Sequence, residues 1–288
     1  MTSVADAASK AQTLIDALPY IRAYRNRVVV VKLGGEPLDD PVRAARVAED
    51  LALLVLVGVR VVVVHGGGPQ ISRAMRSSGI SPHFVGGLRV TDDDTMRVVE
   101  QILIGEINLG LVGRLNSAGV AAVGLSGVDG GCMAAEREMS PDGAGLGRVG
   151  RVAGVDAKLF VSLLDRGFTP VVATVAATAQ GETLNVNADA AAAAIAGSLG
   201  AEKLIYLTNV EGLYRDLGDS DSLISELKSG DLAQLAEGLS EGMRPKAASA
   251  LAAICAGVGK VHILDGRVEH CLLLEIFTSE GIGTQVLP

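Results

Sequence analysis

Short apolar runs recur along the chain, and residues with helical periodicity fill most of the intervals between them. The six runs lie at Val28–Val31, Val61–Val64, Val120–Val123, Pro170–Thr174, Leu204–Leu207 and Val261–Leu264. The intervening stretches Pro41–Val57, Gln70–Ser77 and Asp93–Ala118 repeat apolar positions at helical spacing. Apolar strands that alternate with helices are typical of a parallel sheet covered on both faces. The pattern predicts an α/β three-layer sandwich with a mainly parallel central sheet.

Residues 1–24 precede the first predicted strand and show the periodicity of an amphipathic helix over Ser3–Tyr24. Six apolar side chains fall on one side of this helix: Ala8, Ala11, Leu14, Ile15, Leu18 and Ile21. Such a helix either packs on its own domain or serves as an oligomerisation arm. Periodicity alone leaves both interpretations open.

The segment Met133–Val152 is rich in glycine and charge, which predicts a hairpin or a loop excursion. It separates an N-terminal half, residues 25–154, from a C-terminal half, residues 155–288. Two lobes with a cleft between them fit this pattern, and a single continuous sheet fits it as well.

Composition restricts the core and the partners of the protein. Hydrophobic residues make up 49% of the 288 residues but aromatic residues only 3%, so Val, Leu, Ile and Ala must build the core. The net charge of −8 argues against a nucleic acid or an anionic membrane as partner. A phosphate ligand must therefore be held by a local positive site.

The three cysteines, Cys132, Cys255 and Cys271, lack the spacing of metal ligands. Each is predicted to be a reduced thiol in the core or just below the surface, which indicates a cytoplasmic protein without a disulfide framework. The N-terminus lacks the pattern of a signal peptide, and no apolar run reaches the roughly 18 residues of a membrane span.

Four polar or glycine-rich clusters follow predicted strands and contain the candidate chemistry. They are Lys32-Leu-Gly-Gly35, His65-Gly-Gly-Gly-Pro69, Asn185-Val-Asn-Ala-Asp189 and Gly242-Met-Arg-Pro-Lys246. Parallel sheets bind ligands at the carboxyl ends of their strands, and consecutive glycine N–H groups before a helix form an anion site. The spacing matches neither the dinucleotide fingerprint nor the P-loop.

The candidate cations each allow two interpretations. Lys32 either faces a ligand at the end of its strand or is an exposed lysine before a tight turn. Lys246 stands near a helix start, where a cation is disfavoured unless a phosphate requires it, or it is simply exposed. Arg89, flanked by glycines, suits a carboxylate, although a solvated loop arginine has the same pattern.

Asn185, Asn187 and Asp189 precede an alanine-rich helix and are ordinary capping residues by type. A cap needs only one of them, so the asparagines are also candidates to orient a substrate carboxylate and amide. Asp189 is a candidate to accept bonds from two lysines and hold them apart. His65 is predicted to be structural and to hold its glycine loop.

In this order and at these separations, the clusters resemble the amino-acid kinase family from Val28 to Val286, and within it the members that phosphorylate N-acetyl-L-glutamate. The resemblance implies phosphoryl transfer from ATP to the γ-carboxylate in arginine biosynthesis, with Mg²⁺ held mainly by ATP and without protein metal ligands. It implies that Lys32 and Lys246 are catalytic and that Asp189 organises them. The implied substrate-binding residues are Gly67, Gly68, Arg89, Asn185 and Asn187.

The same resemblance implies a nucleotide site, where Gly35 lets the ATP phosphates approach. Its other implied residues are Asn209, Val210, Glu211, Gly212, Leu213, Tyr214, Gly238, Leu239 and Ser240. Residues 25–154 would form the lobe for amino-acid-substrate binding and dimerisation, and residues 155–288 the ATP-binding lobe.

Three places depart from the family pattern. Asn108-Leu-Gly110 stands where many members have Asn-Lys-Glu, Asn209 where many have Asp, and Glu36-Pro37 where small or apolar residues are common. The alternatives are a paralogous kinase that forms an acylphosphate on a related acylated amino acid, an aspartate or glutamate kinase, and a non-catalytic arginine-sensing protein. The retained lysines and Asp189 favour an enzyme.

Two end segments, Leu18-Pro-Tyr20-Ile and Val261 to Thr284, resemble the arginine-inhibited, hexameric members of the family. This implies a homohexamer, a trimer of dimers joined through the helix of residues 1–24, with L-arginine as inhibitor. The implied arginine-binding residues are Tyr20, Lys203, His262, Glu275 and Gly281. Alternatively, Glu275 is a structural carboxylate that caps a C-terminal helix.

Overall fold

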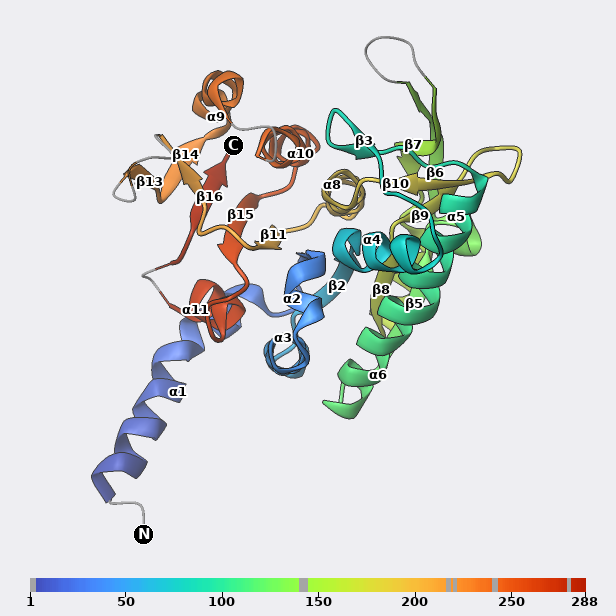
Figure 1. Cartoon of the computed structure of the whole chain (residues 1–288). Coiled ribbons are helices and arrows are strands. Elements are labelled where there is room, and N and C mark those ends of the chain that lie inside the picture. The colour runs from blue at the N-terminus through green and yellow to red at the C-terminus, as the bar shows by residue number, and fades with distance from the viewer. Residues whose placement is uncertain (1–3, 140–144, 216–218, 220–221, 240–242, 279–280) are drawn as a thin grey trace.

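The structure, a computed structural model, describes residues 4–139, 145–215, 219, 222–239, 243–278 and 281–288. Within them, a central sheet has the strand order β14-β16-β15-β11-β1-β2-β8-β5 (Figure 1). Its strands are β1 Val28–Leu33, β2 Arg60–His65, β5 Ala122–Ser126, β8 Thr169–Ala173, β11 Lys203–Thr208, β14 Glu226–Lys228, β15 Lys260–Asp265 and β16 Thr284–Leu287. Neighbours pair in parallel except β15 with β16. The sheet is continuous, one of the two arrangements that the sequence left open.

Helices cover both faces of this sheet, so the predicted three-layer sandwich is confirmed. Side chains of a strand alternate between the faces. Val30 packs with one set of helices, and Val29 and Val31 pack with the other. The first set is α7 Lys158–Asp165, α8 Ala188–Ser198 and α10 Arg244–Cys255, and the second is α3 Pro41–Leu56, α6 Leu109–Ser117 and α11 Cys271–Phe277.

The expected excursion after Met133 is a hairpin of β6 Met133–Met139 and β7 Gly145–Val155. It closes into a small four-stranded barrel with β9 Val175–Ala177 and β10 Thr183–Val186, which the sequence did not predict. Strand β7 runs across the expected boundary between residues 154 and 155, and β8 lies between β2 and β5.

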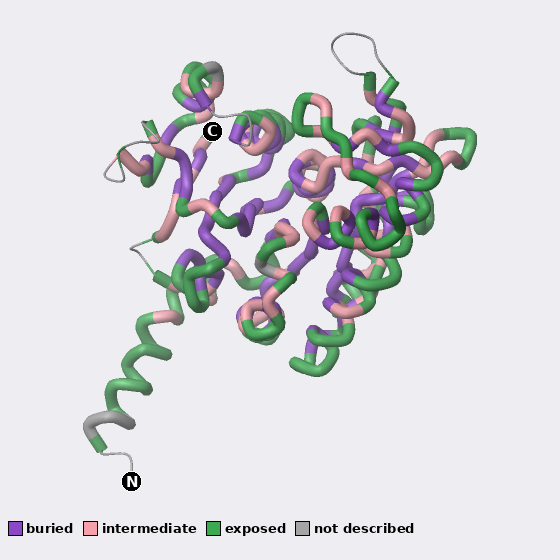
Figure 2. Tube along the Cα trace, in the orientation of Figure 1, coloured by how far each residue is buried: buried purple, intermediate pink, exposed green. Residues whose placement is uncertain are grey.

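The predicted N-terminal helix is α1, Val4–Tyr24, and it projects from the body of the molecule (Figure 1). Most of its length is exposed (Figure 2), with 70% of Leu14 and 56% of Ile15 accessible. Only its last turn packs on the core, through Tyr24. The interpretation that this helix packs along its own domain is therefore wrong for most of its length.

The stretch predicted as one helix over Asp93–Ala118 is divided into three parts. It runs as α5 Asp93–Glu100, a π-helix Gln101–Asn108, and α6. A π-helical turn in a longer helix often marks a functional site, and this one lies beside the cavity described below.

Short elements complete the described chain. They are α2 Gly35–Asp39, α4 Gly68–Ser77, α9 Ser229–Leu235, β3 Phe84–Val85, β4 Leu88–Arg89, β12 Leu213–Tyr214, β13 Leu223–Ile224 and the 3₁₀ turns Asp129–Gly131 and Ala236–Gly238. Among the described helices, none is long and apolar enough to cross a membrane. Cys132 and Cys271 are buried, but Cys255 at the end of α10 is exposed, contrary to the prediction for that thiol.

Candidate functional site

Residues of three of the four clusters meet where β1 and β2 end, and Lys246 of the fourth joins them through an ion pair with Asp189. Leu33 pairs with His65 at these carboxyl ends, so the loops that follow the two strands lie together. They border a cavity of about 220 Å³. The predicted residues that line it are Lys32, Gly35, Gly67, Gly68, Arg89, Asn185, Asn187 and Asp189.

An ion cluster forms one wall of this cavity. Asp189, buried in the first turn of α8, lies 2.7 Å from Lys32 Nζ and 3.5 Å from Lys246 Nζ. Burial alone raises the pKa of the Asp189 carboxyl, but Lys32 and then Lys246 lower it, so that its pKa lies below the usual value. Asp189 is an anion between two cations, as expected. Lys32 is 8% exposed, and its interpretation as an exposed lysine is wrong.

The glycine loops allow the backbone to pass close to neighbouring groups. A Cβ at Gly35 would lie 2.6 Å from Pro69 Cδ, and one at Gly67 would collide with Ile107 and Leu103. A Cβ at Gly68 meets no atom within 4 Å. A side chain at Gly35 or Gly67 would therefore force neighbouring side chains to move, whereas Gly68 borders open space.

Arg89 is buried at the end of β4, so its interpretation as a solvated loop arginine is wrong. Its guanidinium donates to Ser72 Oγ at 2.8 Å and to Gly68 O at 2.9 Å. It also stacks on the Phe84 ring, 4.7 Å from the centroid. These contacts hold a cation beside the second glycine loop, and burial lowers the pKa of Arg89.

The two asparagines act differently. Asn187 caps α8, since its Oδ1 accepts from the N–H groups of Asp189 and Ala190. Asn185 Nδ2 lies 3.3 Å from Thr91 Oγ1, which itself donates to Arg89 O at 2.7 Å. Thr91 thus links Asn185 to Arg89, a relay that the sequence analysis missed.

The apolar wall of the cavity was not predicted from the sequence either; it is made by Ile71, Phe84, Leu103 and Val149. These residues cannot be told from ordinary core residues in the sequence. His65, predicted to be structural, is fully buried and contacts Gly66 O through Nδ1.

The residues assigned to the nucleotide site lie away from this cavity, except Gly35. Asn209, Glu211 and Gly238 are exposed, while Leu213 and Leu239 are buried. A Cβ at Gly212 would collide with Thr284, so this glycine allows close packing against β16. Ser240 lies outside the described residues.

A second cavity, of about 330 Å³, lies between α1, α11 and the strands β11 and β15. All the residues assigned to arginine line it: Tyr20, Lys203, His262, Glu275 and Gly281. Buried Glu275 is 2.9 Å from Lys203 Nζ and 2.6 Å from His262 Nδ1. Burial raises the pKa of Glu275, but these two basic groups bring it below its usual value. Glu275 lies inside α11 and not at its cap, so the capping role is wrong, whereas the buried ion pairs fit a structural carboxylate.

A parallel α/β sandwich with a glycine-rich anion loop, a lysine near the end of β1 and a second lysine in the first turn of α10 is typical of a protein that binds phosphorylated ligands. The chain belongs to the amino acid kinase family, whose model matches residues 27–265.

Similar proteins include the acetylglutamate kinase of Acidothermus cellulolyticus, 47% identical over 287 residues, with 97% of each chain covered. The acetylglutamate kinase of Corynebacterium glutamicum is 44% identical and covers 97% of this chain and 89% of its own.

Among solved structures, the N-acetylglutamate synthase of Neisseria gonorrhoeae complexed with coenzyme A and N-acetyl-glutamate has a TM-score of 0.87 at 30% identity. The match covers 96% of this chain but only 63% of the synthase chain. The Giardia lamblia carbamate kinase bound to AMP-PNP has a TM-score of 0.66 at 15% identity, which supports the fold alone.

Proposed function

We propose that this protein phosphorylates the γ-carboxylate of N-acetyl-L-glutamate with ATP, giving N-acetyl-L-glutamyl 5-phosphate in arginine biosynthesis. The observation that carries the proposal is the cavity that Lys32 and Asp189 line together with the glycine loop and Arg89, with Lys246 paired to Asp189. Full-length relatives named acetylglutamate kinase support the substrate. The cytoplasm, where ATP is available, is the proposed place of the reaction.

The proposed mechanism needs no covalent intermediate. The substrate carboxylate is already ionised and attacks the terminal phosphate in line, so no general base is required. Lys32 and Lys246 stabilise charge on the transferring phosphoryl group, because preorganised cations act where charge develops. Asp189 holds the two ammonium groups apart and keeps them in place.

The substrate is proposed to lie along the glycine loop. Gly67 and Gly68 offer backbone N–H groups at the end where the carboxylate reacts, and Arg89 pairs with the other carboxylate. Asn185 presents its amide to the acylated nitrogen, with its orientation set by Thr91. Asn187 assists mainly through the cap of α8.

ATP is proposed to enter from the C-terminal side, with residues 25–154 as the substrate and dimerisation lobe and residues 155–288 as the ATP-binding lobe. Asn209 to Tyr214 and Gly238 to Ser240 would contact the nucleotide, and Gly35 its phosphates. Two ammonium groups and free glycine N–H groups suit a polyphosphate chemically. Mg²⁺, held mainly by the ATP phosphates, would neutralise their charge.

Regulation by L-arginine in a homohexamer is proposed for the second cavity. Its lining combines the Glu275 carboxylate with Lys203 and His262, and Tyr20 of α1 borders it. Nε2 of buried His262 has no partner among the described residues. Because Nδ1 faces the Glu275 carboxylate, which only accepts, the neutral ring is protonated at Nδ1, and Nε2 can accept a bond from a ligand. Carboxylate and ammonium groups suit the two charged ends of arginine. An N-acetylglutamate synthase complexed with L-arginine has a TM-score of 0.82 to this chain.

The direct test supplies ATP, Mg²⁺ and N-acetyl-L-glutamate and traps the product with hydroxylamine. An acylphosphate yields a hydroxamate, so hydroxamate should form in step with ADP. Release of ADP without hydroxamate would show an alcohol or water as acceptor and overturn the proposal.

A panel of substrates distinguishes the alternatives. Faster turnover with another acylated amino acid indicates a paralogue, and turnover with free aspartate or glutamate indicates those kinases. Binding of arginine without any turnover indicates a non-catalytic sensor.

A further inference from the structure

A buried network lies behind the glycine loop, and the proposed chemistry does not use it. His65 is fully buried at the end of β2, and burial lowers the pKa of its imidazole to about 4, so the ring is neutral near pH 7. Its Nε2 lies 3.0 Å from Asn108 Nδ2, and its Nδ1 lies 3.2 Å from Gly66 O. Asn108 is buried at the last position of the π-helix.

The partners of Asn108 determine which ring nitrogen of His65 carries the proton. Asn108 Nδ2 also donates to Val171 O at 2.8 Å, and because a carbonyl only accepts, the amide must present its NH₂ group here. Its second N–H points at His65 Nε2, which must then be the unprotonated nitrogen. The proton of the neutral ring is on Nδ1, and Nδ1–H donates to Gly66 O.

This donation sets the direction of the next N–H group. Gly66 O and Gly67 N–H belong to one trans peptide and point in opposite directions. With the carbonyl held toward His65, the Gly67 N–H is turned away from the ring. It donates to no other group of the described residues, and Gly67 lines the cavity.

We propose that His65 and Asn108 are positioning residues that aim the Gly67 N–H at the charge developing between the carboxylate and the transferring phosphoryl group. This rests on the proposed kinase activity. Neither residue touches substrate. Gly124 supports the arrangement, because a Cβ there would collide with Asn108 Oδ1. The π-helix thereby has a role: it delivers Asn108 to the back of the anion loop.

The tautomer is tested without substrate. The chain has four histidines, so a spectrum of ¹⁵N-labelled imidazoles is simple, and the signal lost in His65→Asn identifies His65. We expect a neutral ring protonated at Nδ1, unchanged from about pH 5 to about pH 8. In Asn108→Leu, which removes the donor to Nε2, the fraction of His65 rings protonated at Nδ1 should fall. A ring protonated at Nε2, or one that titrates near pH 6.5, overturns the proposal.

Steady-state kinetics compare variants that lose the Nδ1–H donor of His65, or its orientation, with a variant that replaces it. His65→Leu and Asn108→Leu should lower kcat by about tenfold or more, with KM for both substrates nearly unchanged, since a misaimed donor acts on the transition state. His65→Asn, whose amide can replace Nδ1–H, should recover most of the turnover.

Asn116→Leu is the matched control, because among the described residues the Asn116 side chain bonds only the backbone of Ala122 in β5, and it should keep kcat. Equal losses in His65→Leu and His65→Asn, or a change in KM or stability alone, overturn the proposal. A wild-type protein that forms no acylphosphate refutes the kinase function instead and leaves the tautomer measurement valid.

Discussion

At the scale of single residues, local charge outweighs the charge of the whole chain. A net charge of −8 repels phosphates, yet buried Lys32 and partly exposed Lys246 both pair with Asp189. Asp189 compensates part of their charge and so lowers the free-energy cost of burying Lys32. The cluster remains positive by one unit, since two cations surround one anion. This is the local positive site that the composition required.

Replacing Lys246 tests this cluster with little risk to the fold, because its side chain is 21% exposed and lies at the edge of the ion pair. Lys246→Ala should lower kcat by roughly a hundredfold or more, as for the loss of an electrostatic donor in the transition state. Steady-state kinetics and thermal unfolding are measured together. Lys158→Ala, at a lysine paired with Asp156 on the surface, is the control. Normal turnover of Lys246→Ala removes its proposed role.

The residues that were predictable from the sequence share one property: each stands at a strand end or a helix start. Lys32 directly follows a run of valines, and Asp189 follows a helix cap, so their positions at a strand end and a helix start could be predicted. His65 and Asn108 are 43 positions apart, and only the π-helical turn brings them together. Thr91 was missed because its partner Asn185 lies in β10, 94 positions further along the chain.

At the scale of elements, the π-helix and the second glycine loop fit against each other. Gly67 leaves space for Leu103 and Ile107 of the π-helix, while Gly68 begins α4 and faces the cavity. Two neighbouring glycines therefore serve different purposes. Gly67 leaves room for the π-helix while its N–H borders the cavity, and Gly68 keeps space open for the ligand.

Single alanine substitutions separate these purposes. Gly67→Ala forces Ile107 and Leu103 to move and should lower the free energy of unfolding by about 1–3 kcal/mol, the usual cost of overpacking. Gly68→Ala should leave the free energy of unfolding nearly unchanged and reduce turnover, because its methyl group enters space meant for substrate. Denaturant titration and activity are compared for both variants. Equal stability of the two proteins contradicts this assignment.

The elements differed in how well the sequence predicted them. The core strands were found because continuous valine runs are typical of the buried strands of a parallel sheet. The small barrel was missed because β7 contains four glycines and lacks a clear alternation, and β9 has only three residues. The π-helix has the same apolar spacing as the α-helices around it, so periodicity could not separate them.

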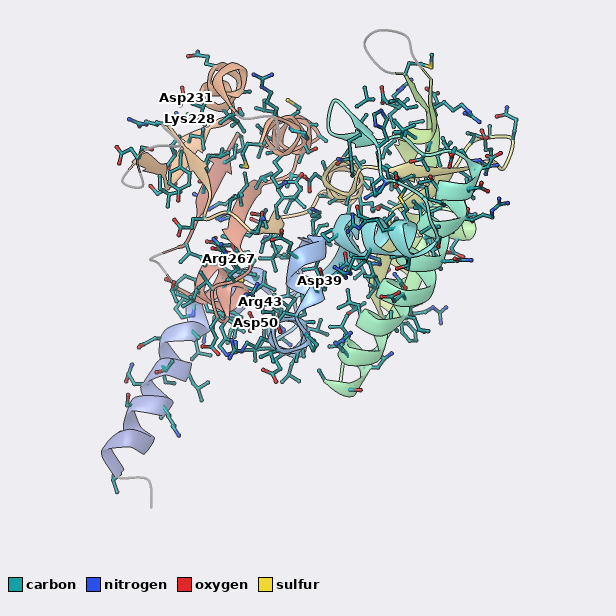
Figure 3. The ribbon with its side chains drawn as sticks, viewed as in Figure 1. Asp39, Arg43, Asp50, Lys228, Asp231 and Arg267 are labelled. Atoms are coloured by element: carbon teal, nitrogen blue, oxygen red, sulfur yellow. The ribbon has the colours of Figure 1, made fainter. Side chains whose placement is uncertain are left out.

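At the scale of the whole molecule, α1 leaves an apolar surface without a partner in the single chain (Figures 1 and 2). Its base borders the second cavity through Tyr20, and Lys203 Nζ lies 5.1 Å from the centre of the Tyr24 ring. A rearrangement of α1 would therefore change the contacts that line the proposed arginine site. Helix α11, which carries Glu275, is tied to α3 by His270 and Asp50, the latter labelled in Figure 3. The second cavity is therefore in contact with α1 and, through α11, with the core.

Charged substitutions at exposed apolar positions of α1 test the proposed hexamer and its regulation together. Burying a leucine or isoleucine side chain contributes about 1.5–3 kcal/mol, and both Leu14 and Ile15 would be buried in each pair of helices. Leu14→Glu with Ile15→Glu should therefore convert a hexamer of 29.5 kDa subunits into dimers and weaken inhibition by arginine, while turnover without arginine persists. Light scattering and inhibition curves measure both effects. Gln12→Glu adds charge at an exposed polar position of the same helix and should remain hexameric. An intact protein that is already a dimer and ignores millimolar arginine refutes the regulatory proposal and leaves the kinase proposal standing.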